Sequence, residues 1–426
     1  MVNNLKFESQ KLAINYFTVA AILFGAQLVM GLIAATQFLY PSFLFEIFDF
    51  SVARMVHINA LVVWMLYAMI GSVYYLLPDE TGIETVGIKL GKIAFYILTA
   101  AVTVVVLVYI LVQVGPATES TIWLINEGRE YIEAPRWADI GIVVVVLVFV
   151  FNLFATAMKG KQTGIVTVLM ADVLALAGLY LAGMFWTDNI SVDQYWWWWV
   201  IHLWVEATWE VFVGCLLSYG LIKIIGARRE VVEMWLWIEV SMLFGSGILG
   251  MGHHYFWIGT PEYWWEIGAL FSALEPVPLV AMFVHVIYDW GKETGLKESH
   301  GSGEKTMNNS PAFAWFVTNA FGNFLGAGVW GFFHTLPQVN IYTHGTQFTS
   351  AHGHLAFFGA YATILIGMFY MGVQGKNGIK VLKATFESKM AIFLITFGVL
   401  GMTVSLTVAG YGQVLVERAQ MGATWE

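Results

Sequence analysis

Long uninterrupted runs of apolar residues dominate this chain. Each run is roughly 20 to 30 residues long, and since a helix rises about 1.5 Å per residue, each can cross about 30 Å of hydrocarbon. Hydrophobic residues make up 58% of the 426 and charged residues only 12%, about half the share in a soluble protein. The sequence therefore predicts an all-α polytopic membrane protein and excludes a soluble globular enzyme.

We expect eleven spans in this chain. They begin near Ala13, Val52, Leu90, Ile140, Thr167, Trp196, Met234, Tyr263, Phe313, Gln347 and Met390, and the last ends near Val414. The first is read as a retained helix, because it is too long for a secretory signal. No stretch between spans is large enough for a second soluble core, so residues 1–426 are expected to form a single transmembrane domain, with an outer acidic loop at about 116–139.

The basic residues indicate the orientation. Sixteen of the 20 Lys and Arg residues fall on the side of the N-terminus, and the exceptions are Arg54, Arg129, Arg136 and Arg418. Because cytoplasmic loops are enriched in Lys and Arg, the N-terminus is expected in the cytoplasm. A net charge of -9 without a basic tract excludes nucleic-acid binding, and a single cysteine, Cys215, leaves histidines and carboxylates as the metal ligands.

Six of the ten histidines are expected at one depth, in the outer half of the membrane. They are His57, His202, His253, His254, His352 and His354, from four different spans. One such histidine is most simply a hydrogen-bonded bundle residue, but a metal or haem requires several ligands that converge on one layer. The remaining four, His285, His300, His334 and His344, are read as structural or solvated.

The spacings refine this prediction. His352 and His354 in the S-A-H-G-H motif are two residues apart, about 200° around a helix, so they suit two different haem irons, with His57 as a second axial ligand to one of them. His202 and Glu206 are four residues apart and share a helical face. With His253 and His254 they offer three nitrogens and one oxygen, a set that suits iron(II) better than copper(I).

Five sequence blocks carry a family resemblance. The chain resembles the catalytic subunit of bacterial cytochrome-c-dependent nitric oxide reductase, a branch of the haem-copper oxidase superfamily, in R-M-V-H-I-N (Arg54 to Asn59), H-L-W-V-E-A-T-W-E (His202 to Glu210), G-M-G-H-H-Y-F-W-I-G (Gly250 to Gly259), L-E-P-V-P (Leu274 to Pro278) and S-A-H-G-H (Ser350 to His354). The resemblance implies a haem-copper-oxidase-like bundle. The family usually has twelve spans, one more than we expect here.

The resemblance also implies roles for the residues. His57 and His354 would be the axial ligands of a low-spin haem b, and His352 would bind the active-site haem b. His202, His253, His254 and Glu206 would hold a non-haem iron, where 2 NO + 2 e⁻ + 2 H⁺ → N2O + H2O. Glu275 and Glu210 resemble further active-site glutamates, although each also reads as a buried, neutral, hydrogen-bonded carboxyl.

The outer acidic loop has an implied role as well. In the family, the residue at the position of Glu130 binds a calcium ion that bridges haem propionates. Arg54 and Arg129 are natural partners of these propionates, and Glu133 lies on a proposed outer proton route. Without the resemblance this loop reads as a solvated acidic segment.

The resemblance implies a partner and a location. Since the chain has no haem c motif and no long N-terminal extension, electrons would come from a membrane-anchored cytochrome c subunit that docks on the outer face and forms a heterodimer. The enzyme would lie in the bacterial inner membrane with its active site toward the periplasm, and it would serve denitrification.

Two other functions compete with this one. A haem-copper oxygen reductase would hold copper in place of the non-haem iron, and Tyr255 beside His254 is a tyrosine of the kind that such enzymes use. A proton-coupled transporter would use the intramembrane His and Glu residues as relays and would contain no haem. A structural b-type cytochrome would not need His202, Glu206, His253 and His254 together.

Overall fold

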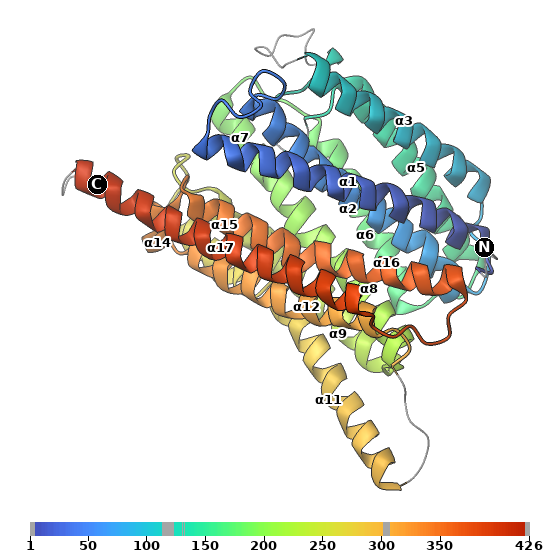
Figure 1. Cartoon of the computed structure of the whole chain (residues 1–426). Coiled ribbons are helices and arrows are strands. Elements are labelled where there is room, and N and C mark those ends of the chain that lie inside the picture. The colour runs from blue at the N-terminus through green and yellow to red at the C-terminus, as the bar shows by residue number, and fades with distance from the viewer. Residues whose placement is uncertain (1–4, 113–122, 130, 132, 301–306, 422–426) are drawn as a thin grey trace. The chain divides into compact units, whose positions relative to one another are not determined.

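Helices make up most of the described part of the computed structural model of this chain (Figure 1). The structure describes residues 5–112, 123–129, 131, 133–300 and 307–421. Within these ranges the extended structure is limited to an isolated bridge between Asn309 and Leu382. The expected all-α class is confirmed.

Ten helical segments in the described ranges are long and apolar enough to cross a membrane. They begin within a few residues of ten of the eleven expected starts. The other expected span, near Phe313, is a continuous helical stretch of α12 (Ser310–Asn323), η3 (Phe324–Trp330) and α13 (Gly331–Thr335). This stretch is less apolar because it contains Asn319, Asn323 and several glycines. The chain is thus a multi-pass membrane protein.

The helices fall into two compact units. Unit 1 comprises Met1–Met170 and Gly375–Gly378, and unit 2 comprises Ala171–Gln374 and Ile379–Glu426. The expected single domain over residues 1–426 stays a prediction. Helices α6 (Gly164–Gly183) and α16 (Thr363–Asn377) contribute residues to both units.

Unit 1 is organised around a pair of long helices. The long pair is α1 (Glu8–Leu39) and α2 (Phe50–Thr81). The shorter helices of this unit are α3 (Ile88–Val112) and α5 (Arg136–Lys159). Asp49 caps α2 by accepting a hydrogen bond from the Val52 amide, which satisfies one of the free donors at a helix start. The buried Trp64 indole donates to Gln27 Oε1 at 2.7 Å and joins α2 to α1.

Unit 2 contains most of the predicted ligands. Its further elements are α7 (Ile190–His202), η1 (Leu203–Trp209), α8 (Glu210–Ile225), α9 (Arg229–Gly250), η2 (Met251–His254), α10 (Tyr263–Ser272), α11 (Val277–His300), α14 (Pro337–Thr343), α15 (Gln347–Ala356), η4 (Phe357–Ala362) and α17 (Phe386–Met421). Three segments of this unit are π-helical, namely η1, η4 and the η3 segment given above. Such segments are rare and are frequently found at functional sites.

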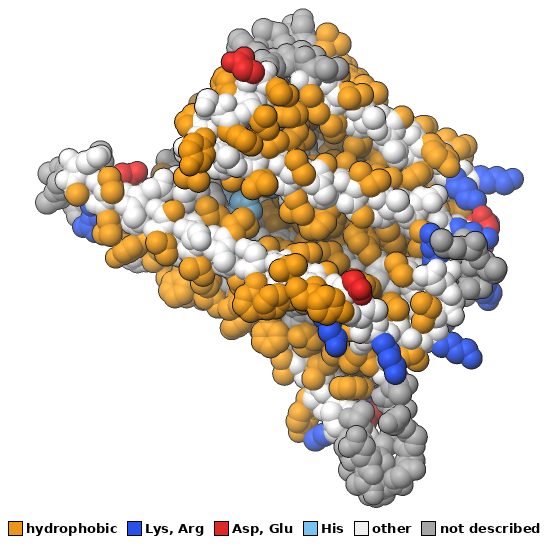
Figure 2. All heavy atoms as spheres, in the orientation of Figure 1, with side chains coloured by type: hydrophobic (Ala, Val, Ile, Leu, Met, Phe, Trp, Pro, Cys, Tyr) orange, Lys and Arg blue, Asp and Glu red, His pale blue; other side chains and the backbone are white. Residues whose placement is uncertain are grey.

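Apolar side chains also cover the outside of the helices. Figure 2 shows hydrophobic atoms spread over the visible face with few charged atoms among them. On α17, Phe386 is 75% exposed and Val408 is 67% exposed. Exposed apolar area of this extent suits contact with lipid tails and agrees with the membrane assignment.

Candidate metal centre

Four of the predicted ligands converge in unit 2. His202, Glu206, His253 and His254 each offer one ligand atom, and these atoms lie within 4.8 Å of one another. We refer to these four residues as the candidate metal centre. They come from the end of α7, from η1 and from η2. Within the described ranges this is the one group of three or more His, Cys, Asp or Glu residues with such spacing.

The Glu206 carboxylate lies among the three imidazoles. Its Oε1 is 2.9 Å from His254 Nε2, and its Oε2 is 3.3 Å from His253 Nε2 and 3.4 Å from His202 Nδ1. One carboxylate and three imidazoles form the mixed oxygen and nitrogen set expected from the sequence. This set suits a first-row divalent metal.

Hydrogen bonding orients His202 toward the centre. Its Nε2 lies 2.6 Å from the Gly247 carbonyl oxygen, which is a hydrogen-bond acceptor, so Nε2 carries the proton. Nδ1 is then a lone-pair donor, and this buried atom has no hydrogen-bond partner in the described part of the chain. Metal-bound histidines almost always donate their other ring N–H in this way. The orphaned Nδ1 therefore fits a metal ligand.

Local packing holds the two histidines of η2. The Trp198 indole stacks on the His254 ring at 4.9 Å with an interplanar angle of 6°. Gly252, just before the pair, lies so close to α10 that an added Cβ would be 1.9 Å from the Trp264 carbonyl oxygen. A side chain at this position would push η2 away from α10. The contact between Trp198 and His254 could not be predicted from the sequence, because residues on separate helices share no spacing signal.

The helix that carries Glu206 differs from the expected one. His202 and Glu206 were predicted on one face of an α-helix, whereas η1 begins at Leu203 with π-helical hydrogen bonds that reach one residue further. The Nδ1–Oε2 distance of 3.4 Å shows that the two side chains still face each other. The widened turn is a local feature that periodicity alone does not reveal.

The two further glutamates are both buried in unit 2. Glu275 Oε1 is 3.9 Å from His202 Nε2, and Glu275 Oε2 accepts a hydrogen bond from Ser272 at 3.3 Å. Glu210 is the first residue of α8, directly after η1. The structure therefore brings Glu275 to the edge of the candidate metal centre and places Glu210 one turn beyond Glu206.

The predicted haem ligands share one hydrogen-bonding pattern. In unit 2, His352 Nδ1 lies 3.2 Å from the Gly326 carbonyl and His354 Nδ1 lies 2.7 Å from the Ser350 carbonyl. In unit 1, His57 Nδ1 lies 2.8 Å from the Gln27 carbonyl. In each ring Nδ1 thus faces a backbone carbonyl, the arrangement in which a metal-bound histidine donates from one ring nitrogen and uses the other for the metal.

The outer acidic loop belongs to unit 1. Glu130, the predicted calcium ligand, lies outside the described residues. Arg129 is buried and Arg54 is exposed on α2. The buried Glu127 pairs with Arg136 at 2.5 Å, and the backbone carbonyl of Glu133 accepts a hydrogen bond from Tyr109 at 2.6 Å. Glu127 and Glu133 are therefore held by contacts with the helices of unit 1, unlike the residues of a fully solvated loop.

Comparison with known proteins places this geometry in context. A family model described as cytochrome c and quinol oxidase polypeptide I matches residues 11–425. The chain is 41% identical over 420 residues to a nitric oxide reductase subunit of Stutzerimonas stutzeri, covering 97% of this chain and 86% of that protein. It is 20% identical over 433 residues to a cytochrome c oxidase subunit 1 homolog of Agrobacterium tumefaciens (strain T37), covering 95% and 74%.

Proposed function

The chain belongs to the family of cytochrome c and quinol oxidase polypeptide I, within its nitric oxide reductase branch, and from this premise we propose that it is the catalytic subunit of a nitric oxide reductase. The reaction is the reduction of two NO to N2O and water. The observation that carries the proposal is the carboxylate of Glu206 among three imidazoles at the candidate metal centre.

The candidate metal centre would hold a non-haem iron. Three histidines and one carboxylate suit iron(II), and the orphaned Nδ1 of His202 is a lone-pair donor well suited to a metal. Trp198 and Gly252 would keep His253 and His254 in place when the metal binds. A rigid supporting shell of this kind normally accompanies a functional metal site.

Two b haems complete the proposed cofactor set. His352 would bind the active-site haem, and His57 and His354 would bind the low-spin haem, since Nδ1 of each ring faces a backbone carbonyl. When bound, the haems and the non-haem iron would carry the electrons from the donor to NO and supply the redox chemistry of the reduction.

The glutamates of unit 2 would manage protons. Glu275 lies at the edge of the candidate metal centre, and Glu210 lies one turn beyond Glu206. Buried carboxyls so close to a site that consumes protons can hold a proton and release it to the reacting oxygen. Glu206 would remain a ligand, since its two oxygens face the three imidazoles.

The remaining proposals concern the partner subunit, a calcium ion and the location of the protein. A partner subunit is supported because the relative in Stutzerimonas stutzeri is named as one subunit of its enzyme. By the family resemblance, this partner would be a membrane-anchored cytochrome c subunit that supplies the electrons. A calcium ion would bind at Glu130, with Arg54 and Arg129 as partners of haem propionates. The protein would lie in the bacterial inner membrane, with a cytoplasmic N-terminus and the active site toward the periplasm.

Oxygen reduction is the second candidate function. The cytochrome c oxidase subunit 1 homolog of Agrobacterium tumefaciens favours it, as does Tyr255 beside His254. However, the Tyr255 hydroxyl has two hydrogen-bond acceptors at 3.3 Å, the Tyr195 carbonyl and Met251 Sδ, and neither belongs to the candidate metal centre. NO reduction needs no such tyrosine.

Gas measurements separate the two activities. The purified complex, supplied with a reduced electron donor, is given NO without oxygen and then oxygen without NO. We expect one N2O for each two NO consumed and a much slower use of oxygen. Rapid oxygen consumption without N2O formation would establish the oxygen reductase and end the present proposal.

A further inference from the structure

Two hydroxyl groups donate hydrogen bonds to the backbone of η1, the segment that carries Glu206. The Tyr361 hydroxyl lies 3.0 Å from the Val205 carbonyl oxygen, and the Thr208 hydroxyl lies 2.6 Å from the Trp204 carbonyl oxygen. These two carbonyls directly precede Glu206 in the chain. Helices depart from the regular α-helical ladder where side chains bond to their carbonyls. The two hydroxyls therefore act on the backbone at the place where η1 departs from the α-helix.

Tyr361 is itself firmly held. It is 3% exposed, and its ring packs edge-on against Trp209, the last residue of η1, at 5.4 Å and 87°. The Phe357 ring lies 5.6 Å away on its own segment. The Asn319 amide donates to the carbonyls of the two residues before Tyr361, at 2.9 and 2.8 Å. Since both its ring and its backbone are fixed, Tyr361 can resist a movement of η1.

Tyr361 also connects two sets of predicted ligands within unit 2. It lies on η4, which continues α15 directly, and α15 carries the predicted haem ligands His352 and His354. The other partner of its hydrogen bond, Val205, lies on η1 next to Glu206. This bond therefore joins the helix of the haem ligands to the segment that presents the carboxylate of the candidate metal centre.

The position of Glu206 has to be set closely because its two oxygens face three imidazoles. Oε1 lies 2.9 Å from His254, and Oε2 lies 3.3 Å from His253 and 3.4 Å from His202. Relaxation of η1 to an α-helix would shift its hydrogen bonds by one residue and rotate Glu206 about the helix axis. A ligand needs an outer contact that fixes its orientation, and Glu206 obtains it through the backbone of η1.

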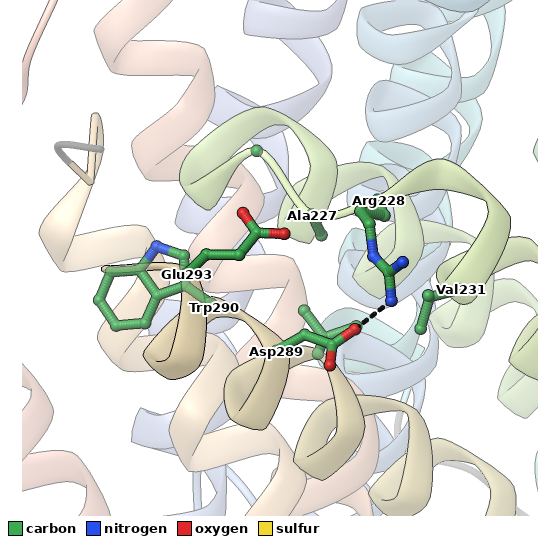
Figure 3. Close-up of a pocket in the computed structure, with 8 residues that line it drawn as sticks. Ala227, Arg228, Val231, Asp289, Trp290 and Glu293 are labelled. Atoms are coloured by element: carbon green, nitrogen blue, oxygen red, sulfur yellow. Dashed lines mark hydrogen bonds and ion pairs between the residues drawn. The ribbon is translucent and has the colours of Figure 1, made fainter. Parts of the chain in front are cut away.

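The far end of the same helical stretch is held by a different kind of contact. Helix α8 follows η1 and has 16 residues, about 24 Å of helix, ending at Ile225. Figure 3 shows Arg228, just beyond this end, against Asp289 of α11, and the two side chains form an ion pair. Because this pair lies so far along the stretch from η1, its removal loosens the end of α8 without touching Val205.

We propose that Tyr361 is a positioning residue for the metal-binding carboxylate. Its hydroxyl, together with that of Thr208, holds η1 in its π-helical turn so that Glu206 lies among the three imidazoles. This rests on the proposed function, in which the candidate metal centre holds a non-haem iron. Tyr361 acts through the Val205 carbonyl, and it transfers neither a proton nor an electron.

The variant Y361F tests the proposal in the complete complex. Phenylalanine keeps the ring that packs on Trp209 but removes the hydrogen bond to Val205. We expect the non-haem metal to bind about two- to tenfold more weakly in chelator competition, with unchanged haem content. In the cobalt(II)-substituted protein, X-ray absorption at the cobalt edge reports on this site alone and should show a longer or lost metal–carboxylate bond. NO turnover should fall by about tenfold.

Further variants separate positioning from general stability. T208V removes the second hydroxyl and should change the cobalt spectrum in the same direction, whereas T208S keeps a hydroxyl and should restore the wild-type spectrum. Two controls should retain the wild-type spectrum and metal affinity. D289N removes the ion pair of Figure 3, and T403V removes a buried hydroxyl bond of the same kind on α17, 2.8 Å from the Val399 carbonyl oxygen.

Unchanged metal affinity and an unchanged cobalt spectrum in Y361F would overturn the proposal. If Y361F does not assemble, the same two results in T208V would overturn it. Both quantities are measured without NO, so they do not depend on the reaction. Failure of the proposed function is distinguishable, because the wild type would then form no N2O whatever its metal affinity.

Discussion

Substitution of Gly252 by alanine should weaken metal binding at the candidate metal centre and leave the haems in place. An alanine Cβ would lie 1.9 Å from the Trp264 carbonyl oxygen, and Cβ atoms in real structures are essentially never closer than 3.0 Å to such a neighbour. Since the obstacle is backbone, η2 has to move away from α10 by about an ångström. His253 and His254 follow Gly252 directly and must move with it.

The size of the effect follows from this displacement. Overpacking of this kind destabilises by about 1–3 kcal/mol, and since about 1.4 kcal/mol is tenfold in an equilibrium constant, iron affinity should fall roughly tenfold to a hundredfold. NO turnover should fall by about a hundredfold, as expected for a 1 Å misplacement at a reacting centre. The assay is the ratio of iron to haem after dialysis against a chelator, together with the rate of N2O formation.

A control on the adjoining helix makes this test specific. Gly245 on α9 has nothing within 4 Å of an added Cβ, so G245A should retain iron and activity. If G252A keeps its non-haem iron and its full rate, the packing of η2 against α10 does not position the ligands, and our reasoning about the candidate metal centre is wrong.

Three further predictions concern other residues of unit 2. W198A removes the ring that stacks on His254 and should weaken iron binding by about 0.5–1.5 kcal/mol, measured by chelator competition, with unchanged haem content. G322A places a Cβ 2.5 Å from the Gly359 Cα, where α12 packs against the π-helical segment η4, and should lower the thermal unfolding temperature while iron affinity in the folded fraction stays the same. Y255F removes a hydroxyl hydrogen bond worth about 1 kcal/mol and should leave the NO reduction rate within about twofold of wild type, whereas a tyrosine essential for turnover would abolish it.

The sequence predicted most of the fold because long apolar runs leave few alternatives in a membrane. The exception is instructive, since the span near Phe313 is helical but less apolar, owing to Asn319 and Asn323. The Asn319 amide donates to the Gly359 and Ala360 carbonyls at 2.9 and 2.8 Å, which a π-helical segment leaves available. Asn319 in this span thus makes a tertiary contact with η4, and composition alone could not predict which helix it contacts.

The sequence also predicted which residues come together at the candidate metal centre, but it did not predict the contacts that hold them in place. His202 and Glu206 were paired by spacing, and the structure places them 3.4 Å apart. The Gly247 carbonyl that orients His202 comes from another helix and has no side-chain signal.

Metal analysis of the purified protein tests the central claim most directly. The account predicts about three irons for each two b haems, without copper, and loss of the third iron in a variant such as H253A while both haems remain. One copper for each two haems, with no iron beyond that of the haems, would contradict the assignment of His202, Glu206, His253 and His254 as an iron site and would favour oxygen reduction.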